Sequence, residues 1–143
     1  MLHFHGEADT SILTIGSIRY HESGRKIMYP GLSFEEGNEK LNDWYRLYII
    51  PGATNGATND ERPNAGIPRD NFAHMIEWVE YGVVPVTINA TVESCAKEGE
   101  VQHVCTWPYR HYWVNDTTMI CKNDASSVGA ILWDLDAYLQ PVY

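Results

Sequence analysis

Two short apolar segments alternate with two segments of helical spacing in the N-terminal part of this chain. The apolar segments span residues 2–5 and 44–50, and the second is rich in aromatic and β-branched residues. Helical spacing covers residues 17–28 and recurs after a helix start at Asp70 or Asn71. A strand–helix–strand–helix order is typical of a parallel sheet with right-handed crossovers. The sequence therefore predicts an α/β fold.

The remaining segments are expected to connect and extend this unit. The first helix ends at Tyr29-Pro30-Gly31, and the acidic, Gly-containing residues 33–42 are expected to form an exposed connection. Residues 51–68 are expected to form a loop, functional or disordered at that length, and the chain beyond Val86 is less regular. The apolar stripe of the first helix contains Ile18, His21, Ile27 and Met28. The apolar face of the second contains Phe72, Met75, Ile76 and Val79.

Charge and hydropathy exclude several classes of partner. A formal net charge of −9 opposes nucleic acid or an anionic membrane, because binding to both depends on Lys and Arg that neutralise phosphates. No run approaches the roughly 18 apolar residues of a membrane span. Residues 1–6 lack the charged start and apolar stretch of a signal peptide. The chain opens directly in a strand, which indicates that an upstream segment is missing.

The cysteines and histidines show no metal-binding pattern. The three cysteines, Cys95, Cys105 and Cys121, contain no Cys-x-x-Cys pair, and no His or Cys pair has zinc-ligand spacing. We therefore predict no metal and no cofactor. Sequons at Asn89 and Asn115 are candidate glycosylation sites and an indication of secretion.

Asp9 is the first candidate for a catalytic residue. It lies just past the first strand in a Gly-containing turn, a suitable place for the Asp of a Ser-Asp-His triad. An Asp in a turn more commonly serves the turn itself. The triad His of an α/β-hydrolase lies on the loop after the next strand, and residues 51–68 contain no histidine. The chain also lacks a Gly-x-Ser-x-Gly nucleophile elbow.

A series of motifs runs through the chain in unbroken order. It begins with His-Gly-Glu-Ala-Asp at residues 5–9 and continues with Leu-Asn-Asp-Trp-Tyr-Arg-Leu at residues 41–47 and Pro-Gly-Ala at residues 51–53. Later motifs are Thr-Asn-Asp-Glu at residues 58–61, Ile-Glu-Trp-Val-Glu at residues 76–80, Asn-Ala-Thr at residues 89–91, Gly-Glu at residues 99–100, Cys-Thr-Trp-Pro at residues 105–108 and Asp-Leu-Asp-Ala-Tyr at residues 134–138. The series resembles the C-terminal part of fungal tannases, within the tannase and feruloyl esterase family.

The resemblance implies a fold and an activity. Members of that family are secreted serine esterases with an α/β-hydrolase fold, and they cleave galloyl or feruloyl esters. Residues 1–143 would then be the C-terminal part of such a domain, ending in an irregular, disulfide-containing tail. The half that carries the nucleophilic Ser would be absent, as would the lid domain with its calcium site.

The resemblance also places the triad residues. Asp9 falls on the triad Asp, whereas in residues 51–56 Asn55 stands where the family has the triad His and Gly56 where it has a Cys. An amide cannot accept the proton of a serine hydroxyl at neutral pH, so Asn55 is not competent as the base. Loss of a triad His lowers turnover by about a millionfold. We expect the chain alone to be inactive, unless a histidine ring lies beside the Asp9 carboxylate with a serine on its far side.

The other histidines are expected to be structural. His5 is expected to fix the Asp9 loop, and His74 to lie on the exposed side of its helix. His103 and His111 are expected at surface or packing positions.

By the same resemblance, Cys105 and Cys121 form a structural disulfide, Cys95 is free or paired outside the chain, and the protein is secreted. The implied ligand is a small-molecule phenolic ester, and the implied partner is the missing N-terminal half. Two hypotheses stay open: a piece of a carboxylic ester hydrolase, or an inactive relic or binding module. Since two parallel strands leave apolar faces uncovered, the isolated chain is expected to aggregate or to be partly disordered.

Overall fold

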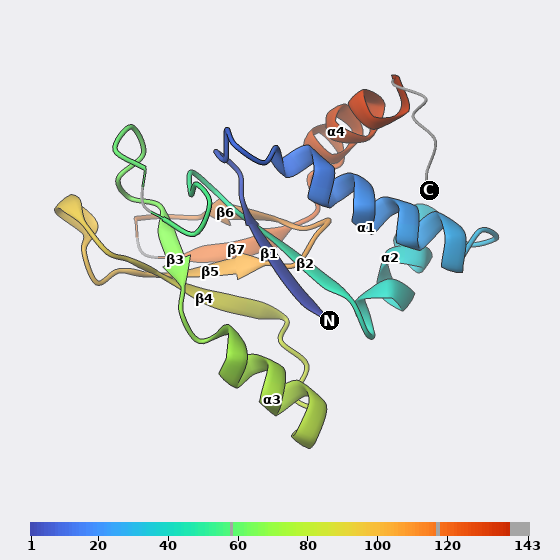
Figure 1. The fold of residues 1–143 in the computed structure, drawn as a ribbon, viewed down its shortest axis with the longest axis horizontal. Coiled ribbons are helices and arrows are strands. Elements are labelled where there is room, and N and C mark those ends of the chain that lie inside the picture. Colours follow the sequence, from blue (N-terminus) through green and yellow to red (C-terminus); the bar gives the residue numbers. More distant parts are fainter. Residues whose placement is uncertain (58, 117, 138–143) are drawn as a thin grey trace.

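The computed structural model describes residues 1–57, 59–116 and 118–137 of the chain, with side chains as far as Trp133. Figure 1 shows the arrangement of its elements. In chain order these are β1 (Leu2–Gly6), α1 (Thr14–Met28), α2 (Phe34–Asn42), β2 (Arg46–Ile50), β3 (Gly66–Pro68), α3 (Asn71–Tyr81), β4 (Thr87–Val92), a 3₁₀ turn (Cys95–Lys97), β5 (Val101–Cys105), β6 (Arg110–Trp113), β7 (Met119–Lys122) and α4 (Ala125–Ala137). No helix in the described part of the chain is long and apolar enough to cross a membrane.

β1 and β2 form the parallel pair that the sequence predicts. The register runs from Leu2 opposite Arg46 to Gly6 opposite Ile50, and the chain crosses between the strands through α1 and α2 (Figure 1). On its other edge β2 forms an antiparallel bridge to Thr106. The mixed α/β class is thereby confirmed.

Residues 33–42 contain helix α2. Their acidic residues are exposed as expected, but Gly37, Asn38, Leu41 and Asn42 are buried. The Ser33 hydroxyl accepts a hydrogen bond from the Glu36 N–H at 3.2 Å, and the Glu36 carboxylate accepts one from the Ser33 N–H at 3.1 Å. This reciprocal capping box fixes the helix start. The exposed Glu35 and Glu36 lie in the first turn, where they complement the positive N-terminal end of the helix.

The apolar stripes of α1 and α3 are only partly buried. On α1, Ile18 and His21 are buried, but Ile27 and Met28 are 66% and 56% exposed. On α3 the apolar side chains Phe72, Ile76 and Val79 are exposed. His74 and Trp78 lie on the less exposed side of α3, so the prediction for His74 is wrong. The Arg46 guanidinium lies 5.7 Å from the Trp78 ring centroid, and this contact turns Trp78 toward β2.

The C-terminal half contains regular secondary structure, so the prediction of an irregular tail is wrong. β3, β4 and β5 form an antiparallel sheet in that order, and β6 and β7 form a separate antiparallel pair (Figure 1). β3 lies within the predicted loop 51–68. In β4 the residues Ile88, Ala90 and Val92 are buried and alternate with polar residues, which is the ordinary signal of a half-buried strand.

Two clusters of buried apolar side chains lie on opposite faces of β2. Tyr48 and Ile50 pack with residues of β3, β4 and β5. Leu47 and Ile49 pack with Ile18, Trp107 and Val128. Because successive strand residues point to opposite faces, this one strand contributes to both clusters.

Candidate active site

The turn after β1 holds Asp9 through its backbone. Asp9 Oδ1 accepts hydrogen bonds from the N–H groups of Ser11 at 2.8 Å and Ile12 at 3.0 Å. The hydrogen bond from the Ile12 N–H lowers the pKa of Asp9. Burial acts in the opposite direction, but Ser11 and His5 also lower the pKa, so it lies below its ordinary value. Asp9 is therefore an ionised carboxylate at neutral pH.

The turn that holds Asp9 is in close contact with the loop after β2. The Ala8 N–H donates to the Ala53 carbonyl at 2.9 Å. A Cβ added to Gly6 would overlap the carbonyl oxygens of Ala53 and Thr54, so only glycine permits this approach. The two segments form one rim at the carboxyl edge of the parallel strands, which is where α/β proteins place their ligand sites.

A cavity of about 280 Å³ opens at this rim. Asp9, His5 and Asn55 all line it, Asp9 as a buried residue and Asn55 as an exposed one. Its apolar lining comes from Phe4, Ile12, Ile50, Ala53, Ile67 and Pro68. An apolar cavity of about 150 Å³ accepts benzene, so this one is large enough for a single substituted phenyl ring.

The structure joins Asp9, His5 and Ser17 in one array. His5 Nε2 lies 2.8 Å from the Ile12 carbonyl oxygen and 3.4 Å from Asp9 Oδ2, and these two acceptors assign the ring proton to Nε2. The unprotonated Nδ1 then accepts a hydrogen bond from the Ser17 hydroxyl at 2.6 Å. This arrangement meets the condition under which the expectation of inactivity would fail.

The surroundings of Ser17 indicate a structural role for the array. Its hydroxyl also lies 3.3 Å from His3 Nε2, so it bridges two histidines of β1 to the first turns of α1. Ser17 is not among the residues that line the 280 Å³ cavity. A carbonyl bound in that cavity therefore has His5 and Asp9 beside it but not the Ser17 hydroxyl. The contacts of His5 confirm that it fixes the Asp9 loop.

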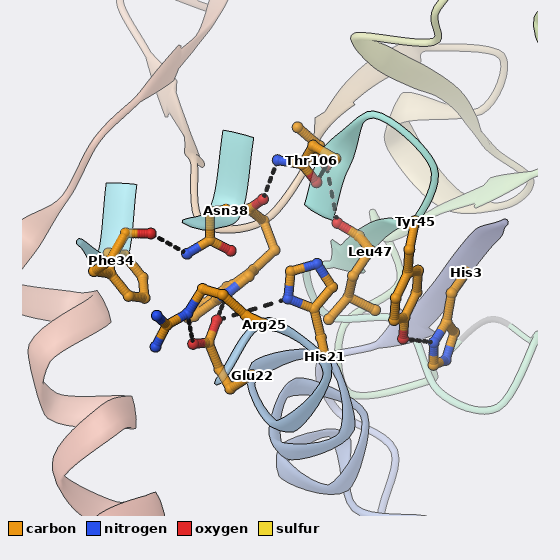
Figure 2. A network of polar contacts seen from close by, with 11 residues as sticks. His3, His21, Glu22, Arg25, Phe34, Asn38, Tyr45, Leu47 and Thr106 are labelled. Carbon is orange, nitrogen blue, oxygen red and sulfur yellow. Dashed lines mark hydrogen bonds and ion pairs between the residues drawn. The ribbon is translucent and has the colours of Figure 1, made fainter. Parts of the chain in front are cut away.

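A second polar network lies buried along α1 (Figure 2). Glu22 accepts hydrogen bonds from Trp107 Nε1 at 2.8 Å and Arg25 Nε at 2.7 Å, and its Oε1 lies 3.6 Å from His21 Nδ1. Burial alone would raise the pKa of Glu22, but the contacts with His21, Trp107 and Arg25 together outweigh it and lower the pKa. No member of this network lines the Asp9 cavity. We therefore regard it as a tie between α1 and the segment after β5.

The cysteines pair as the resemblance implies. A disulfide joins Cys105 of β5 to Cys121 of β7, and Cys95 is exposed and free. Within residues 1–57, 59–116 and 118–137, no group of three or more His, Cys, Asp or Glu side chains could hold a metal ion.

The two sequon asparagines lie at the surface. Asn89 is exposed on β4, with its Oδ1 2.9 Å from His103 Nδ1. Asn115 is exposed in the connection from β6 to β7, and the Thr117 of its sequon lies outside the described residues. His103 is exposed and His111 is half-buried.

Sequence reasoning missed Ser17 and Glu22. Ser17 lies twelve residues after His5 in the sequence, and only the rotation of α1 against β1 brings its hydroxyl to the ring. Glu22 had a weak signal, because it directly follows His21 of the apolar stripe.

Comparison with known proteins places the chain in a family. The sequence model described as "Tannase and feruloyl esterase" matches residues 1–128. A tannase of Aspergillus oryzae is 41% identical over 143 residues, which are 100% of this chain and 24% of that protein. A probable feruloyl esterase of Arthroderma benhamiae is 29% identical over 112 residues, 76% of this chain and 19% of that protein.

Solved structures agree. A tannin acyl hydrolase from Aspergillus niger superposes with a TM-score of 0.91 at 52% identity, over 99% of this chain and 26% of that chain. Feruloyl esterase B from Aspergillus oryzae has the same fold, with a TM-score of 0.69 at 23% identity, over 85% of this chain and 26% of that chain. The chain thus spans about a quarter of the tannases that it matches. It belongs to the tannase and feruloyl esterase family.

Proposed function

We propose that this chain is the segment of a secreted, tannase-type ester hydrolase that contributes the triad carboxylate, Asp9, and that it does not hydrolyse esters by itself. The observation that carries the proposal is the cavity that Asp9 and Asn55 line together. An orienting carboxylate and the expected position of the base face the same small space, and the base is replaced by an amide.

The chemistry of the triad explains why Asn55 is decisive. A serine attacks the ester carbonyl while a histidine accepts its proton, the Asp holds the imidazole, and water then releases the acyl group. Asp9 can still orient an imidazole through Oδ2, because its two backbone hydrogen bonds engage only Oδ1. The Asn55 amide has no basic nitrogen, so it cannot accept that proton.

The proposed ligand is the phenolic part of a galloyl- or feruloyl-type ester. The relatives are named as tannases, a tannin acyl hydrolase and feruloyl esterases. The apolar walls of the cavity suit an aromatic ring, and His5 and Asn55 supply polar groups at its edge.

A second candidate function is hydrolysis through Ser17. The 2.6 Å hydrogen bond to His5 and the Asp9 carboxylate behind the ring favour it. The position of Ser17 outside the lining of the cavity argues against it.

One experiment separates the two candidates. The purified chain is assayed for hydrolysis of methyl gallate and a p-nitrophenyl ester, and for labelling by a fluorophosphonate probe. We expect neither turnover nor labelling. Labelling that disappears in Ser17→Ala but persists in the control Ser23→Ala, on the same helix, would establish the second function and overturn the first.

Secretion is the remaining part of the proposal. The Cys105–Cys121 disulfide is typical of an oxidising compartment, and Asn89 and Asn115 are exposed. Expression in a secreting fungal host should yield a chain whose electrophoretic mobility increases on treatment with an N-glycosidase. The Asn89→Gln and Asn115→Gln variants should each remove one step of that shift.

A further inference from the structure

We propose that Asn55 is a site of spontaneous covalent modification, at which the backbone nitrogen of Gly56 displaces the side-chain ammonia and the amide becomes a carboxylate in the lining of the Asp9 cavity. The reaction consumes only water. It goes beyond the proposed function and is independent of it, because it requires neither a serine nor an ester.

Asn55 is followed directly by a glycine. It is the only one of the nine asparagines in the sequence with this neighbour. Glycine has no Cβ, so its backbone nitrogen meets less steric hindrance than that of any other residue when it approaches the preceding side chain. The least hindered of the backbone nitrogens therefore lies next to the Asn55 carboxamide.

The surroundings of this pair leave it free to react. Asn55 and Gly56 are both exposed in the connection from β2 to β3 (Figure 1). Gly56 has a φ of +68°, and no described atom lies within 4 Å of a Cβ added there. No described residue forms a hydrogen bond with the Asn55 carboxamide, whereas Asn59 Oδ1 accepts one from the Glu61 N–H at 3.0 Å. The Asn55 side chain can therefore rotate toward the Gly56 nitrogen, and water reaches both.

One hydrogen bond opposes the reaction. The Gly56 N–H donates to the Thr54 carbonyl at 2.8 Å and closes a three-residue turn around Asn55. This bond must open before the Gly56 nitrogen can lose its proton. Because it encloses a single exposed residue outside any helix or strand, a local fluctuation opens it at a small fraction of the free energy of global unfolding.

The reaction has two steps. In the first, the Gly56 N–H loses its proton to hydroxide and the nitrogen attacks Asn55 Cγ. A bond from Cγ to the Gly56 nitrogen forms, and the bond from Cγ to Nδ2 breaks with release of ammonia. In the second, water opens either carbonyl–nitrogen bond of the resulting cyclic imide, which leaves an aspartyl or an isoaspartyl linkage at position 55. No oxidant, reductant or cofactor takes part.

The product changes the charge of the Asp9 cavity. Asp9 and Asn55 line the same space of about 280 Å³, and the new carboxylate adds one negative charge to the formal −9 of the chain. A like charge nearby disfavours the ionised form of a carboxyl group. The pKa of Asp9 should therefore be higher in the modified chain than in the intact one, although His5 Nε2 still lies 3.4 Å from Asp9 Oδ2.

The test follows the purified 143-residue chain during incubation in a mildly alkaline buffer. Peptide mapping by mass spectrometry measures the conversion of each asparagine to the acid, and hydroxylamine should cleave the imide between residues 55 and 56. Asn64 is the internal reference, because it is exposed in the same connection but is followed by Ala65. We expect Asn55 to convert at least about tenfold faster than Asn64. Equal rates would overturn the proposal.

Two variants test the nucleophile. Gly56→Ala adds the missing Cβ and should slow the conversion of Asn55 about tenfold or more. Gly99→Ala is the matched control, since Gly99 is also exposed, has a φ of +84° and has no described atom within 4 Å of an added Cβ. It should leave the rate at Asn55 unchanged. An unchanged rate in Gly56→Ala would show that another group attacks and would overturn the role of Gly56.

Unfolding the chain tests the turn around Asn55. The folded chain should convert within about tenfold of the rate in concentrated urea, because only one local hydrogen bond has to open. Protection of the folded chain by about a hundredfold or more would show that the turn blocks the reaction, and would also overturn the proposal.

NMR titration of the Asp9 carboxyl group tests the consequence. Asn55→Asp reproduces the aspartyl product and should raise the pKa of Asp9. Asn64→Asp adds the same charge at an exposed residue outside the lining of the cavity, and should raise it less. Equal titration of Asp9 in the two variants would overturn the placement of the new charge in the Asp9 cavity.

Discussion

Replacing Glu22 by Gln is the sharpest test of what holds α1 in place. The two side chains have nearly the same volume, and the Gln carbonyl can still accept the hydrogen bond from Trp107 Nε1. What is lost is the negative charge beside Arg25, a residue only 8% exposed. An Arg buried without its partner is strongly unfavourable, because its charge is removed from water without compensation.

The magnitude follows from the burial of the pair. Arg25 Nε lies 2.7 Å from Glu22 Oε2, and their side chains are 10% and 3% exposed. Removing one partner of a buried pair costs about 3–5 kcal/mol. With an m-value of about 2 kcal/mol/M, the urea midpoint should fall by roughly 1.5–2.5 M. Tryptophan fluorescence can follow the transition, since Trp107 is part of the network.

The pH dependence supplies an independent readout. The pKa of Glu22 is lowered on folding, so its ionised form contributes stability above its ordinary pKa of 4.5 and loses it as the pH falls through the folded value. Glu22→Gln should remove that part of the acid sensitivity. Glu39→Gln on α2 is the matched control, because Glu39 is exposed, and it should change stability by less than about 0.5 kcal/mol. A Glu22→Gln midpoint within error of this control would refute the argument.

Three further predictions concern the disulfide, the half-buried His3 and the rim. Cys121→Ser opens a loop of 16 residues and should lower the free energy of unfolding by about 3 kcal/mol, measured by thermal or urea unfolding. Cys95→Ser should leave the unfolding midpoint unchanged. Burial, together with His5 and His21, lowers the pKa of His3, so the protein should lose stability as the pH falls below 6.5, and His3→Gln should flatten that slope in urea titrations. Gly6→Ala forces a Cβ against the carbonyl oxygens of Ala53 and Thr54 and should lower the free energy of unfolding by about 1–3 kcal/mol, measured by thermal unfolding. An unchanged melting temperature would contradict the close approach of the Asp9 turn to the loop after β2.

Local sequence patterns predicted the elements better than the faces that they bury. The parallel strands and the start of α3 at Asn71 follow from apolar runs and capping residues, which are local signals. Ile27 and Phe72 were placed on apolar stripes, but periodicity identifies a stripe and not whether another element covers it. In this chain both stripes lie partly at the surface.

The site was predictable only where one residue carries the signal. Asp9 follows a strand in a Gly-containing turn, and it lines the same cavity as Asn55. The contact between His5 and Ser17 depends on how α1 packs on β1, a long-range property for which the sequence has no periodic signal. The antiparallel sheet was missed for a similar reason, since β3 and β4 pair across the whole of α3.

The two backbone hydrogen bonds to Asp9 affect what can be concluded from an aspartate at this position in a related sequence. One carboxylate oxygen secures the turn through two amide hydrogens, and this architectural task does not depend on catalysis. Selection for a stable turn alone is enough to retain an aspartate there. An aspartate at this position is therefore, by itself, poor evidence of catalysis.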